Sequence, residues 1–280
     1  MAASDDDLVL YAVDGDGVAV LTLNRPERRN AWSVELERRF FGLLGDAAAD
    51  PAVRVVVITG AGKAFCPGMD MQRLEQNARP GGSLNLRERV PMYSRRDLPK
   101  PTIAAINGAC AGIGLVQALI CDVRFAARGA RFTTAFTRRG LAGEYNLPWV
   151  LPRLIGVENA MDLLLSGRTF DADEAKRLGL VSRVTEPAEL MDAALAYARD
   201  VARNCSPRAM AVVRHQVHAD LDLPFDAALA RSYAAMEFFA GSADFREGVA
   251  SFAEKRPPRF EGLPAGFDPA AATENAFLPY

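Results

Sequence analysis

The first two-thirds of the chain alternates apolar runs of strand length with stretches of helical periodicity. Residues 8–13 and 18–23 are two such runs, and the Asp-Gly repeat at residues 14–17 between them predicts a β-hairpin. Three later runs have the near-continuous apolar character of strands that are buried on both faces: residues 53–59, 102–106 and 123–126.

Helical signals occupy the stretches between these strands. Ser33 can cap a helix that runs to about Asp46, and the apolar positions that follow, such as Leu36 and Phe40, recur at helical spacing. The same spacing returns over residues 147–154, 158–165 and 173–177. This alternation of strands with helices predicts an α/β fold.

The last third contains helical patterns, with no strand signal after about Val184. Four helices are expected: residues 187–203 with proline first, one from Ser206 and Pro207, one from Pro224, and one capped by Ser242 that ends near Glu254. We therefore predict a core over residues 1–203, a helical region over 204–260 and a tail over 261–280. The tail is rich in Pro, Gly and Ala, so it is either mobile or lies across a neighbouring surface.

Composition narrows the classes of function. Of the 280 residues, 33 are basic and 35 are acidic, and the net charge of -2 argues against sequence-independent binding of nucleic acid as the main task. No apolar run approaches the ~18 residues of a membrane helix, and residues 1–7 are small and acidic, unlike a secretory signal. The four cysteines lack CxxC spacing, which indicates reduced thiols in a cytoplasmic protein: Cys66, Cys110, Cys121 and Cys205.

The chain has two histidines, His215 and His218, and both lie in one predicted helix. Mechanisms that need separated histidines are therefore excluded, including most zinc hydrolases, and a Ser-His-Asp triad would have to use one of these two. Their spacing places them on one helix face, which could suit a metal ion, but no third ligand lies nearby in sequence. We expect an ordinary amphipathic helix and no metal site.

Two glycine-containing segments follow predicted strands and lead toward helices, at residues 60–70 and 107–114. A helix start presents unpaired backbone N–H groups with a dipole that favours negative charge, and glycine lets a ligand approach the backbone closely. Two such segments that converge would form an oxyanion hole without any side chain. Either segment alone is better explained as a tight turn before a capped helix, with Asp70 as the cap.

The segments become far more specific when they are taken together and in order. The sequence VLTLNRP at residues 20–26, followed by Asn30 and Ala31, resembles the opening signature of the crotonase (enoyl-CoA hydratase/isomerase) superfamily. Residues 63–70 and 101–122 resemble its two oxyanion-hole loops. Further matches lie at residues 151–156, 179–181, 244–248 and 252–257, and at Phe260. The resemblance covers about residues 17–260, and the chain is identified as a member of that superfamily.

This resemblance implies the ClpP/crotonase fold, a spiral of ββα units followed by a C-terminal helical region that mediates formation of homotrimers, often as a dimer of trimers. It also implies an acyl-CoA thioester as substrate, with CoA as part of the substrate and no metal or redox cofactor. In the family, two backbone N–H groups hold the thioester oxygen, and these positions fall on Met69 and Ile113 here. Preorganised amides can stabilise a developing enolate by ~3–4 kcal/mol for a single donor.

The resemblance also places residues that bind the substrate. Asn30 and Ala31, with the loop residues Pro67 and Gly68, correspond to the backbone that binds the adenine ring, and Gly112 precedes the second donor. Pro67 departs from the more common alanine, but it lies two residues before the first donor and leaves that N–H in place. The cations that could meet the CoA phosphates are Arg28, Arg29 and Lys255, although surface arginines are commonly just solvated.

Two departures from the family bear on the reaction. Typical hydratases carry two glutamates that activate and protonate water across the double bond. Counting along the matched segments places these positions at Val116 and Phe136, neither of which can move a proton. We therefore do not expect a conventional two-glutamate hydration. Together with Trp149, these side chains favour a bulky or greasy acyl group, or are equally ordinary parts of the core.

A replacement carboxylate lies in the sequence GLAGEYN at residues 140–146. Some isomerases of the family place a single glutamate in a glycine-leucine-x-x-glutamate pattern, and Glu144 matches that pattern. One carboxylate suffices to carry a proton between C2 and C4 through a dienolate, and the adjacent Tyr145 could donate a hydrogen bond or a proton. The competing interpretation makes Glu144 a solvated loop carboxylate.

The leading hypothesis is therefore an enzyme of fatty acid metabolism that acts on an enoyl-CoA by a one-base, isomerase-like reaction. A second is hydrolysis of a carbon–carbon bond, but family members that do this use histidines near the site, and both histidines here lie late in the chain. A third is an acyl-CoA-binding protein that has lost its acids, which Val116 and Phe136 support. Thiolate catalysis by Cys66 or Cys110 is disfavoured because no histidine is available to activate either thiol.

Overall fold

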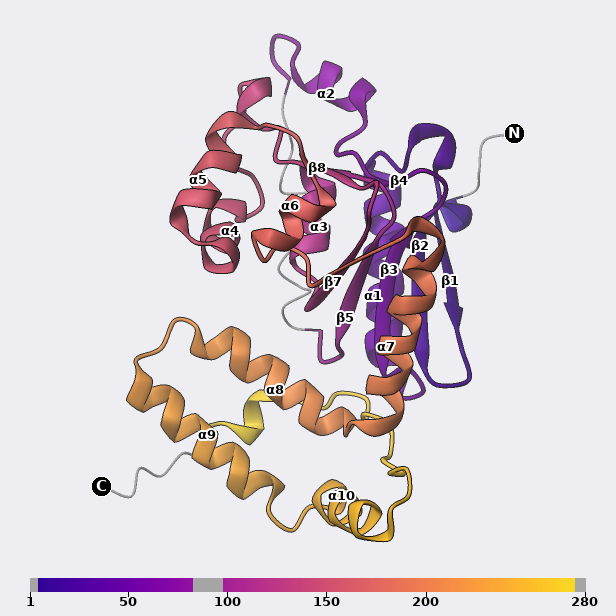
Figure 1. Ribbon diagram of the computed structural model, residues 1–280, viewed down its shortest axis with the longest axis vertical. Helices are drawn as coiled ribbons and strands as arrows, with labels where there is room; N and C mark the ends of the chain where they lie inside the picture. Colours follow the sequence, from indigo (N-terminus) through magenta and orange to yellow (C-terminus); the bar gives the residue numbers. More distant parts are fainter. Residues whose placement is uncertain (1–4, 83–97, 275–280) are drawn as a thin grey trace.

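A six-stranded sheet forms the centre of the core (Figure 1). The computed structural model, which describes residues 5–82 and 98–274, gives its strand order as β1-β2-β3-β5-β7-β10. These strands are β1 (Val9–Val13), β2 (Val18–Leu23), β3 (Val55–Gly60), β5 (Thr102–Ile106), β7 (Val123–Ala127) and β10 (Arg183–Thr185). The predicted hairpin β1–β2 is antiparallel, and every other described neighbour in this sheet pairs in parallel.

A second sheet of four short strands lies beside the first: β4 (Ala64–Cys66), β6 (Ala109–Ala111), β8 (Arg131–Thr133) and β9 (Phe170–Asp171). A long strand is followed by a short one in each of the pairs β3–β4, β5–β6 and β7–β8. Helices α2 (Met71–Asn77) and α3 (Ile113–Leu119) follow β4 and β6. This repetition is the spiral of ββα units that the family resemblance implies.

The short strands correct one sequence-based expectation. The two glycine-containing segments were expected to run as loops into helices, whereas each contains a strand, β4 or β6, before its helix begins. A strand of three residues is too short to produce a recognisable alternation of apolar and polar positions. The glycines on either side therefore made these segments look like loops.

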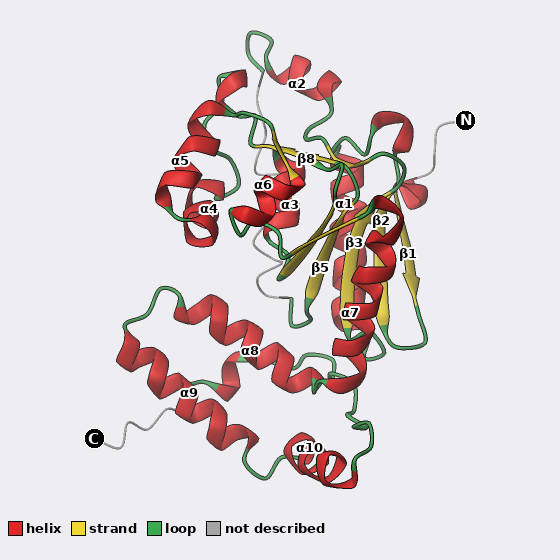
Figure 2. Cartoon of the chain, in the orientation of Figure 1, coloured by secondary structure: helices red, strands yellow, loops and turns green. Residues whose placement is uncertain are grey.

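Two helices cover opposite faces of the large sheet (Figure 2). Helix α1 (Val34–Ala49) begins where Ser33 accepts a hydrogen bond from the Leu36 N–H, and it buries Leu36 and Phe40. Helix α7 (Leu190–Asn204) buries its alanine-rich face against β3, β5 and β7. The expected helix over residues 187–203 therefore begins later, because the turn at Pro187–Glu189 closes as a 3-10 helix.

Three helices occupy the stretches with predicted helical spacing, namely α4 (Leu147–Ile155), α5 (Val157–Ser166) and α6 (Ala172–Arg177). Helix α4 packs against α5, and α6 contacts β8, β9 and β10. The segment that precedes α4 contains Glu144, so this group of helices fixes one wall of the candidate site.

The C-terminal helices extend away from the sheets (Figure 1). They are α8 (Pro207–Asp220), α9 (Phe225–Phe239) and α10 (Ala243–Glu254), and Ser206 and Ser242 cap the first and last of them as predicted. Pro224 is the residue before α9 rather than its first residue. The described part of the tail packs on these helices, since Ala272 contacts the cluster of Val212 and Ala235. The boundaries at residues 203 and 260 remain predictions.

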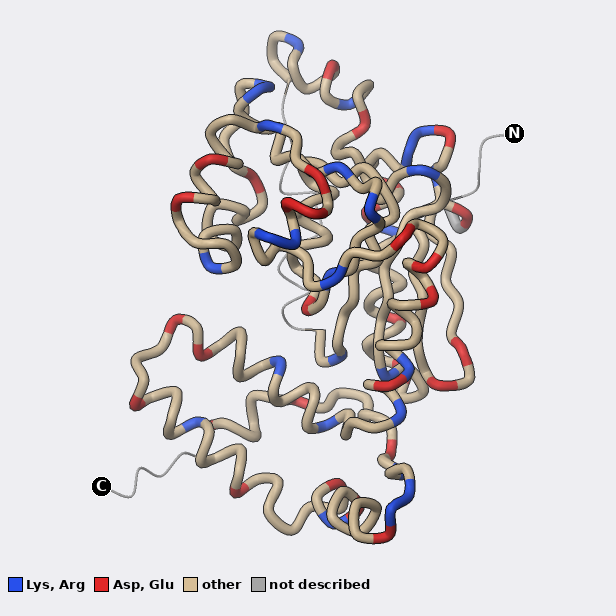
Figure 3. Tube along the Cα trace, viewed as in Figure 1, with Lys and Arg blue, Asp and Glu red and all other residues tan. Residues whose placement is uncertain are grey.

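Charged residues of both signs are interspersed along the chain (Figure 3), in keeping with its small net charge of -2. Among the described residues, no helix combines the length and the apolar character that crossing a membrane would require.

Candidate active site

A cavity of about 330 Å³ opens where the two glycine-containing segments meet, and we call it the glycine-loop cavity. Met69, Ile113, Phe136 and Glu144 all line it. The other described residues in the lining are Arg28, Arg29, Ala31, Pro67, Gly68, Met71, Leu74, Gly112, Thr134, Ala135, Arg139 and Leu141. The fold thus brings both predicted donors and the predicted base to one site.

The parallel pairing of β4 with β6 explains why the two donors lie together. Cys66 is the partner of Cys110 in this pairing, and Met69 and Ile113 each follow three residues later. Because parallel strands run in the same direction, equal offsets bring both positions to the same edge of the sheet. Gly114 permits the approach, since a Cβ at that position would lie 2.1 Å from the Cys66 carbonyl oxygen.

A parallel bridge between Trp32 and Met69 orients the first donor. The Trp32 N–H donates to Gly68 O at 2.8 Å, and the Asp70 N–H donates to Trp32 O at 3.1 Å. Backbone groups alternate sides along an extended segment, so the Met69 N–H faces away from Trp32. Asp70 also caps α2, as predicted, and its carboxylate pairs with Arg25 at 3.2 Å, which fixes the loop.

A sharp turn at Gly112 orients the second donor. Gly112 has φ 50° and ψ -124°, and its N–H donates to Thr133 O at 3.1 Å. Ile113 is then the first residue of α3, where an N–H has no acceptor within the helix. Among the described residues, neither the Met69 N–H nor the Ile113 N–H donates a hydrogen bond to the protein. Two such donors beside one cavity can stabilise negative charge on a single oxygen.

The two positions without a carboxylate occupy different environments. Phe136 is 5% exposed and forms part of the cavity wall, with its ring facing Gly112. Val116 lies inside the buried helix α3 and belongs to the core rather than to the lining. Of these two residues, Phe136 is therefore the one that lines the glycine-loop cavity.

Glu144 is half-buried and is held by a tight turn just before α4. Its carbonyl oxygen accepts a hydrogen bond from the Leu147 N–H at 3.0 Å, and the residues between them, Tyr145 and Asn146, have φ 48° and 61°. Gly143 packs against Pro148 at a distance that leaves no room for a Cβ. The backbone that carries the carboxylate is therefore closely constrained.

Known proteins share this architecture. A model of the enoyl-CoA hydratase/isomerase family matches residues 14–263. The chain belongs to this family. The 1,2-epoxyphenylacetyl-CoA isomerase of Escherichia coli is 36% identical over 258 residues, which cover 88% of this chain and 95% of that protein. The enoyl-CoA hydratase ACTT3 of Alternaria alternata is 35% identical over 257 residues, which cover 89% of this chain and 84% of that protein.

Solved structures of this family have the same fold. An enoyl-CoA hydratase from Bacillus anthracis superposes with a TM-score of 0.85 at 31% identity, over 91% of this chain and 100% of that chain. The protein is therefore an enzyme of the hydratase/isomerase family with a crotonase-like fold. Membership implies an acyl-CoA thioester as the substrate. Because both hydratases and an isomerase are among the similar proteins, it leaves the reaction open.

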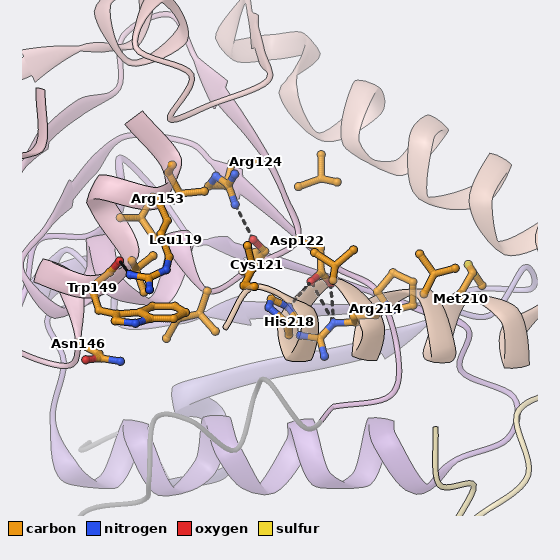
Figure 4. Close-up of a pocket in the computed structure, with 18 of the residues that line it drawn as sticks. Leu119, Cys121, Asp122, Arg124, Asn146, Trp149, Arg153, Met210, Arg214 and His218 are labelled. Carbon is orange, nitrogen blue, oxygen red and sulfur yellow. Dashed lines mark hydrogen bonds and ion pairs between the residues drawn. The ribbon is translucent and has the colours of Figure 1, made fainter. Parts of the chain in front are cut away.

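Two residues expected at the family's active site lie elsewhere. Tyr145 and Trp149 line a second cavity of about 460 Å³ between the core and α8, which we call the α8 cavity (Figure 4). Glu144 lines the first cavity, whereas its neighbour Tyr145 lines the second. The Trp149 ring is covered by the Arg153 guanidinium at 3.7 Å. The structure does not bring these two side chains to Met69 and Ile113.

A charged cluster forms one wall of the α8 cavity, as Figure 4 shows. Asp122 accepts hydrogen bonds from the Thr102 N–H at 2.7 Å and from Arg214 Nε at 2.9 Å, and His218 Nε2 lies 3.6 Å away. Burial alone would raise the pKa of Asp122, but its contacts with His218, Arg214 and Thr102 lower the pKa to about 2. The cluster ties α8 to the start of β5, which is a structural role.

The predicted binding residues divide into three groups. Six line the glycine-loop cavity: Arg28, Arg29, Ala31, Pro67, Gly68 and Gly112. Asn30 is fully buried, and its side chain bonds to the Arg25 N–H at 2.8 Å and to Ala64 O at 2.7 Å, so it supports the loop from behind. Lys255 follows α10 as its C-cap and is not in the described lining of this cavity; α10 and α2 lie at opposite ends of the view in Figure 1.

The two cysteines near the site, Cys66 and Cys110, are fully buried. Burial raises the pKa of the Cys66 thiol to about 12 and raises that of Cys110 well above its ordinary value. A thiolate nucleophile is therefore disfavoured, in agreement with the sequence. Among the described residues, no group of three or more His, Cys, Asp or Glu side chains is placed to hold a metal ion.

Sequence reasoning missed several lining residues, and these are Met71, Leu74, Thr134, Ala135, Arg139 and Leu141. Most are apolar or small and carry no chemical signal. Arg139 is the exception, because it stands five residues before Glu144 on the same segment. Its position beside the predicted base was the clue available in the sequence.

Proposed function

We propose that this enzyme moves a proton between C2 and C4 of an enoyl-CoA thioester, with Glu144 as its one base. The observation that carries the proposal is the convergence of Glu144 with the Met69 and Ile113 amides in one cavity. Glu144 is the sole carboxylate among the described residues of that lining. A base beside two backbone donors suits formation and collapse of an enolate.

In the proposed reaction the two amides stabilise the dienolate and Glu144 transfers the proton. The thioester oxygen accepts hydrogen bonds from the Met69 and Ile113 N–H groups, which makes the protons at C2, or at C4 of a 2-enoyl ester, more acidic. Glu144 takes one such proton and the electron pair enters a dienolate. The same carboxyl group then returns the proton to the other end of the dienolate. The double bond shifts and no water is added or lost.

The surroundings of Glu144 favour this reaction over hydration. Phe136 closes the cavity wall and Val116 stands in the core, and these are the two positions that the family resemblance assigns to the glutamates of hydratases. Addition of water needs a second group to hold and activate the water molecule. With one carboxylate in the described lining, proton transfer within the substrate is the simpler use of the site.

The rest of the cavity suits the CoA portion. Arg28 and Arg29 lie on the segment after Pro26 and supply positive charge for phosphates. Ala31, Pro67 and Gly68 present backbone near them for the adenine ring. Lys255 is not among the described residues that line the glycine-loop cavity, so the proposal does not use it.

We also propose that the enzyme is a homotrimer, alone or as a dimer of trimers. The support is the set of large apolar side chains exposed on the C-terminal helices, which include Val217, Phe225, Met236, Phe245 and Phe252. Exposed apolar surface of this extent is typical of a protein interface. Light scattering at micromolar concentration tests this, and a monomeric mass would contradict it.

The decisive experiment compares matched 2-enoyl-CoA and 3-enoyl-CoA esters, with products separated by chromatography. Wild-type enzyme should interconvert them with little hydration. Glu144→Gln should lower kcat by ~10²-fold or more and retain thioester binding. Glu158→Gln, which changes an exposed glutamate on α5, serves as the control and should retain activity.

Three other outcomes would contradict the proposal. Unchanged turnover in Glu144→Gln would return Glu144 to the solvated-loop interpretation. Binding of thioesters without any turnover would favour the acyl-CoA-binding hypothesis. Cleavage of a diketone substrate would favour the carbon–carbon hydrolase, although neither His215 nor His218 is in the lining of the glycine-loop cavity.

A further inference from the structure

Arg139 stands in the wall of the glycine-loop cavity without a role in the reaction described above. It is the last residue of the 3-10 helix Thr137–Arg139, and Gly140 follows it in the left-handed conformation with φ 69°. The same short segment supplies Phe136, Leu141 and Glu144 to the lining. Arg139 therefore belongs to the side of the cavity that holds the predicted base.

The guanidinium of Arg139 donates one hydrogen bond to the protein, and its other N–H groups are available to a ligand. Its Nη1 donates to Ala135 O at 3.3 Å, and Ala135 has φ 61°, a conformation that alanine rarely adopts. A guanidinium carries five N–H donors. Among the described residues, the guanidinium of Arg139 forms no ion pair and no other hydrogen bond.

The neighbouring Arg138 shows what a structural arginine looks like in this segment. Its Nε donates to Ser166 O at 2.8 Å, and its side chain packs beside Gly167. Arg138 is outside the cavity lining, whereas Arg139 is within it. Adjacent arginines of equal charge are thus used differently.

The charges of the residues that line the cavity also favour an anionic ligand. Its described lining contains three arginines and one glutamate. Arg28 and Arg29 lie on another segment and are assigned to the phosphates of CoA by the proposed function, on which this inference rests. Arg139 instead lines the cavity from the segment that also supplies Glu144, and the proposed function places the acyl group next to that base. A guanidinium that faces a bound ligand matches a carboxylate in geometry and charge.

We propose that the acyl group of the preferred substrate carries a carboxylate, and that Arg139 binds it. The enzyme would then act on thioesters of dicarboxylic acids in preference to neutral fatty acyl thioesters. The positive charge of Arg139 would also offset repulsion between that carboxylate and Glu144. Arg139 is in this role a specificity-determining residue that takes no part in the proton transfer.

The test measures binding of saturated thioesters, so it needs no turnover. Glutaryl-, adipoyl- and suberoyl-CoA are each compared with the neutral acyl-CoA of equal chain length by calorimetry. At one or more lengths, wild-type enzyme should bind the carboxylate ester at least ~10-fold more tightly, which is a typical value for one charged hydrogen bond. Arg139→Gln should reduce this ratio to about one, Arg139→Lys should retain part of it, and Arg138→Gln should leave it unchanged.

Two results would overturn the inference. One is the absence of any preference for the carboxylate esters in the wild-type enzyme. The other is an Arg139→Gln variant that weakens both esters of a pair equally, which would assign Arg139 to the CoA portion. Failure of the isomerase proposal is separate, because it would be seen with enoyl esters and Glu144→Gln, while this ratio depends on binding alone.

Discussion

The glycine-loop cavity and the α8 cavity meet at neighbouring residues, since Glu144 lines the first and Tyr145 lines the second. The first is built by local geometry that repeats along the chain, with a strand, a short strand and a glycine turn before each donor. The second is built by contact between the core and a helix that lies far away in sequence, through Asp122 and Arg214.

The two cavities differ in the kind of polar group that lines them, and this difference indicates what each cavity does. In the glycine-loop cavity the donors are backbone groups, so their positions depend on turns and strand register rather than on side-chain identity. In the α8 cavity the cluster of Asp122, Arg214 and His218 consists of side chains that already contact one another. The first is therefore arranged to act on a ligand, whereas the polar wall of the second is arranged to hold α8 in place.

The largest effect is expected from Gly114→Ala, which tests whether strand register brings the donors together. The new Cβ would lie 2.1 Å from the Cys66 carbonyl oxygen, and backbone cannot yield as a flexible side chain can. We expect a loss of ~1–3 kcal/mol in the free energy of unfolding from overpacking and a fall in kcat/KM of ~10²-fold or more, typical of a lost oxyanion donor. Chemical denaturation and steady-state kinetics measure the two effects.

Gly129→Ala is the matched control for this variant. Gly129 lies in the turn between β7 and β8, and a Cβ there would have no neighbour within 4 Å. Gly129→Ala should change the free energy of unfolding by no more than ~0.5 kcal/mol, as other surface substitutions do. If Gly114→Ala behaves like Gly129→Ala, the close approach of the two loops is not what positions the donors.

The sequence predicts the donors and the base better than it predicts their surroundings. The strands and the cap at Ser33 follow from apolar runs and a hydroxyl at a helix start, which are local signals. The short strands β4 and β6 do not, because three residues carry too little pattern. Their pairing could be known only once the large sheet had set the two segments side by side.

The sequence pattern also does not indicate that Glu144 and Tyr145 line different cavities. It depends on positive φ values at Tyr145 and Asn146, and tyrosine gives no sign of such a conformation in the way that glycine does. A third positive φ occurs at Ala135, whose carbonyl oxygen accepts the hydrogen bond from Arg139. Side-chain direction at these positions is a property of the folded loop and not of the sequence pattern.

A smaller effect is expected for Asp122 in acid, and it tests the structural role of the α8 cavity. The pKa of Asp122 is lowered from 3.8 to about 2 in the folded protein. A lowered carboxyl pKa stabilises the fold above the unfolded value and loses that contribution as the pH falls through the folded value. Between pH ~5 and ~1, roughly 2 kcal/mol of the free energy of unfolding should therefore be lost.

The comparison with Asp122→Asn isolates this term. Asparagine does not titrate, so the difference in unfolding free energy between wild type and variant should shrink as the pH falls through this range. Other acidic groups titrate alike in both proteins and cancel. A difference that stays constant from pH ~5 to ~2 would show that the Asp122 charge does not stabilise the docking of α8.

The smallest effect is expected for Tyr145→Phe, and it tests the boundary between the two cavities. Tyr145 stands next to the base in sequence, and from sequence alone it is a candidate proton donor. Its side chain nevertheless lines the α8 cavity and packs against the core, while the Met69 and Ile113 donors face the other cavity. Phenylalanine retains the ring and removes only the hydroxyl, so kcat should remain within ~3-fold of wild type, whereas loss of a catalytic acid typically costs ~10²–10⁴-fold. A fall of that larger size, with KM unchanged, would mean that the turn at residues 144–147 reverses when substrate binds and that the two cavities act as one site.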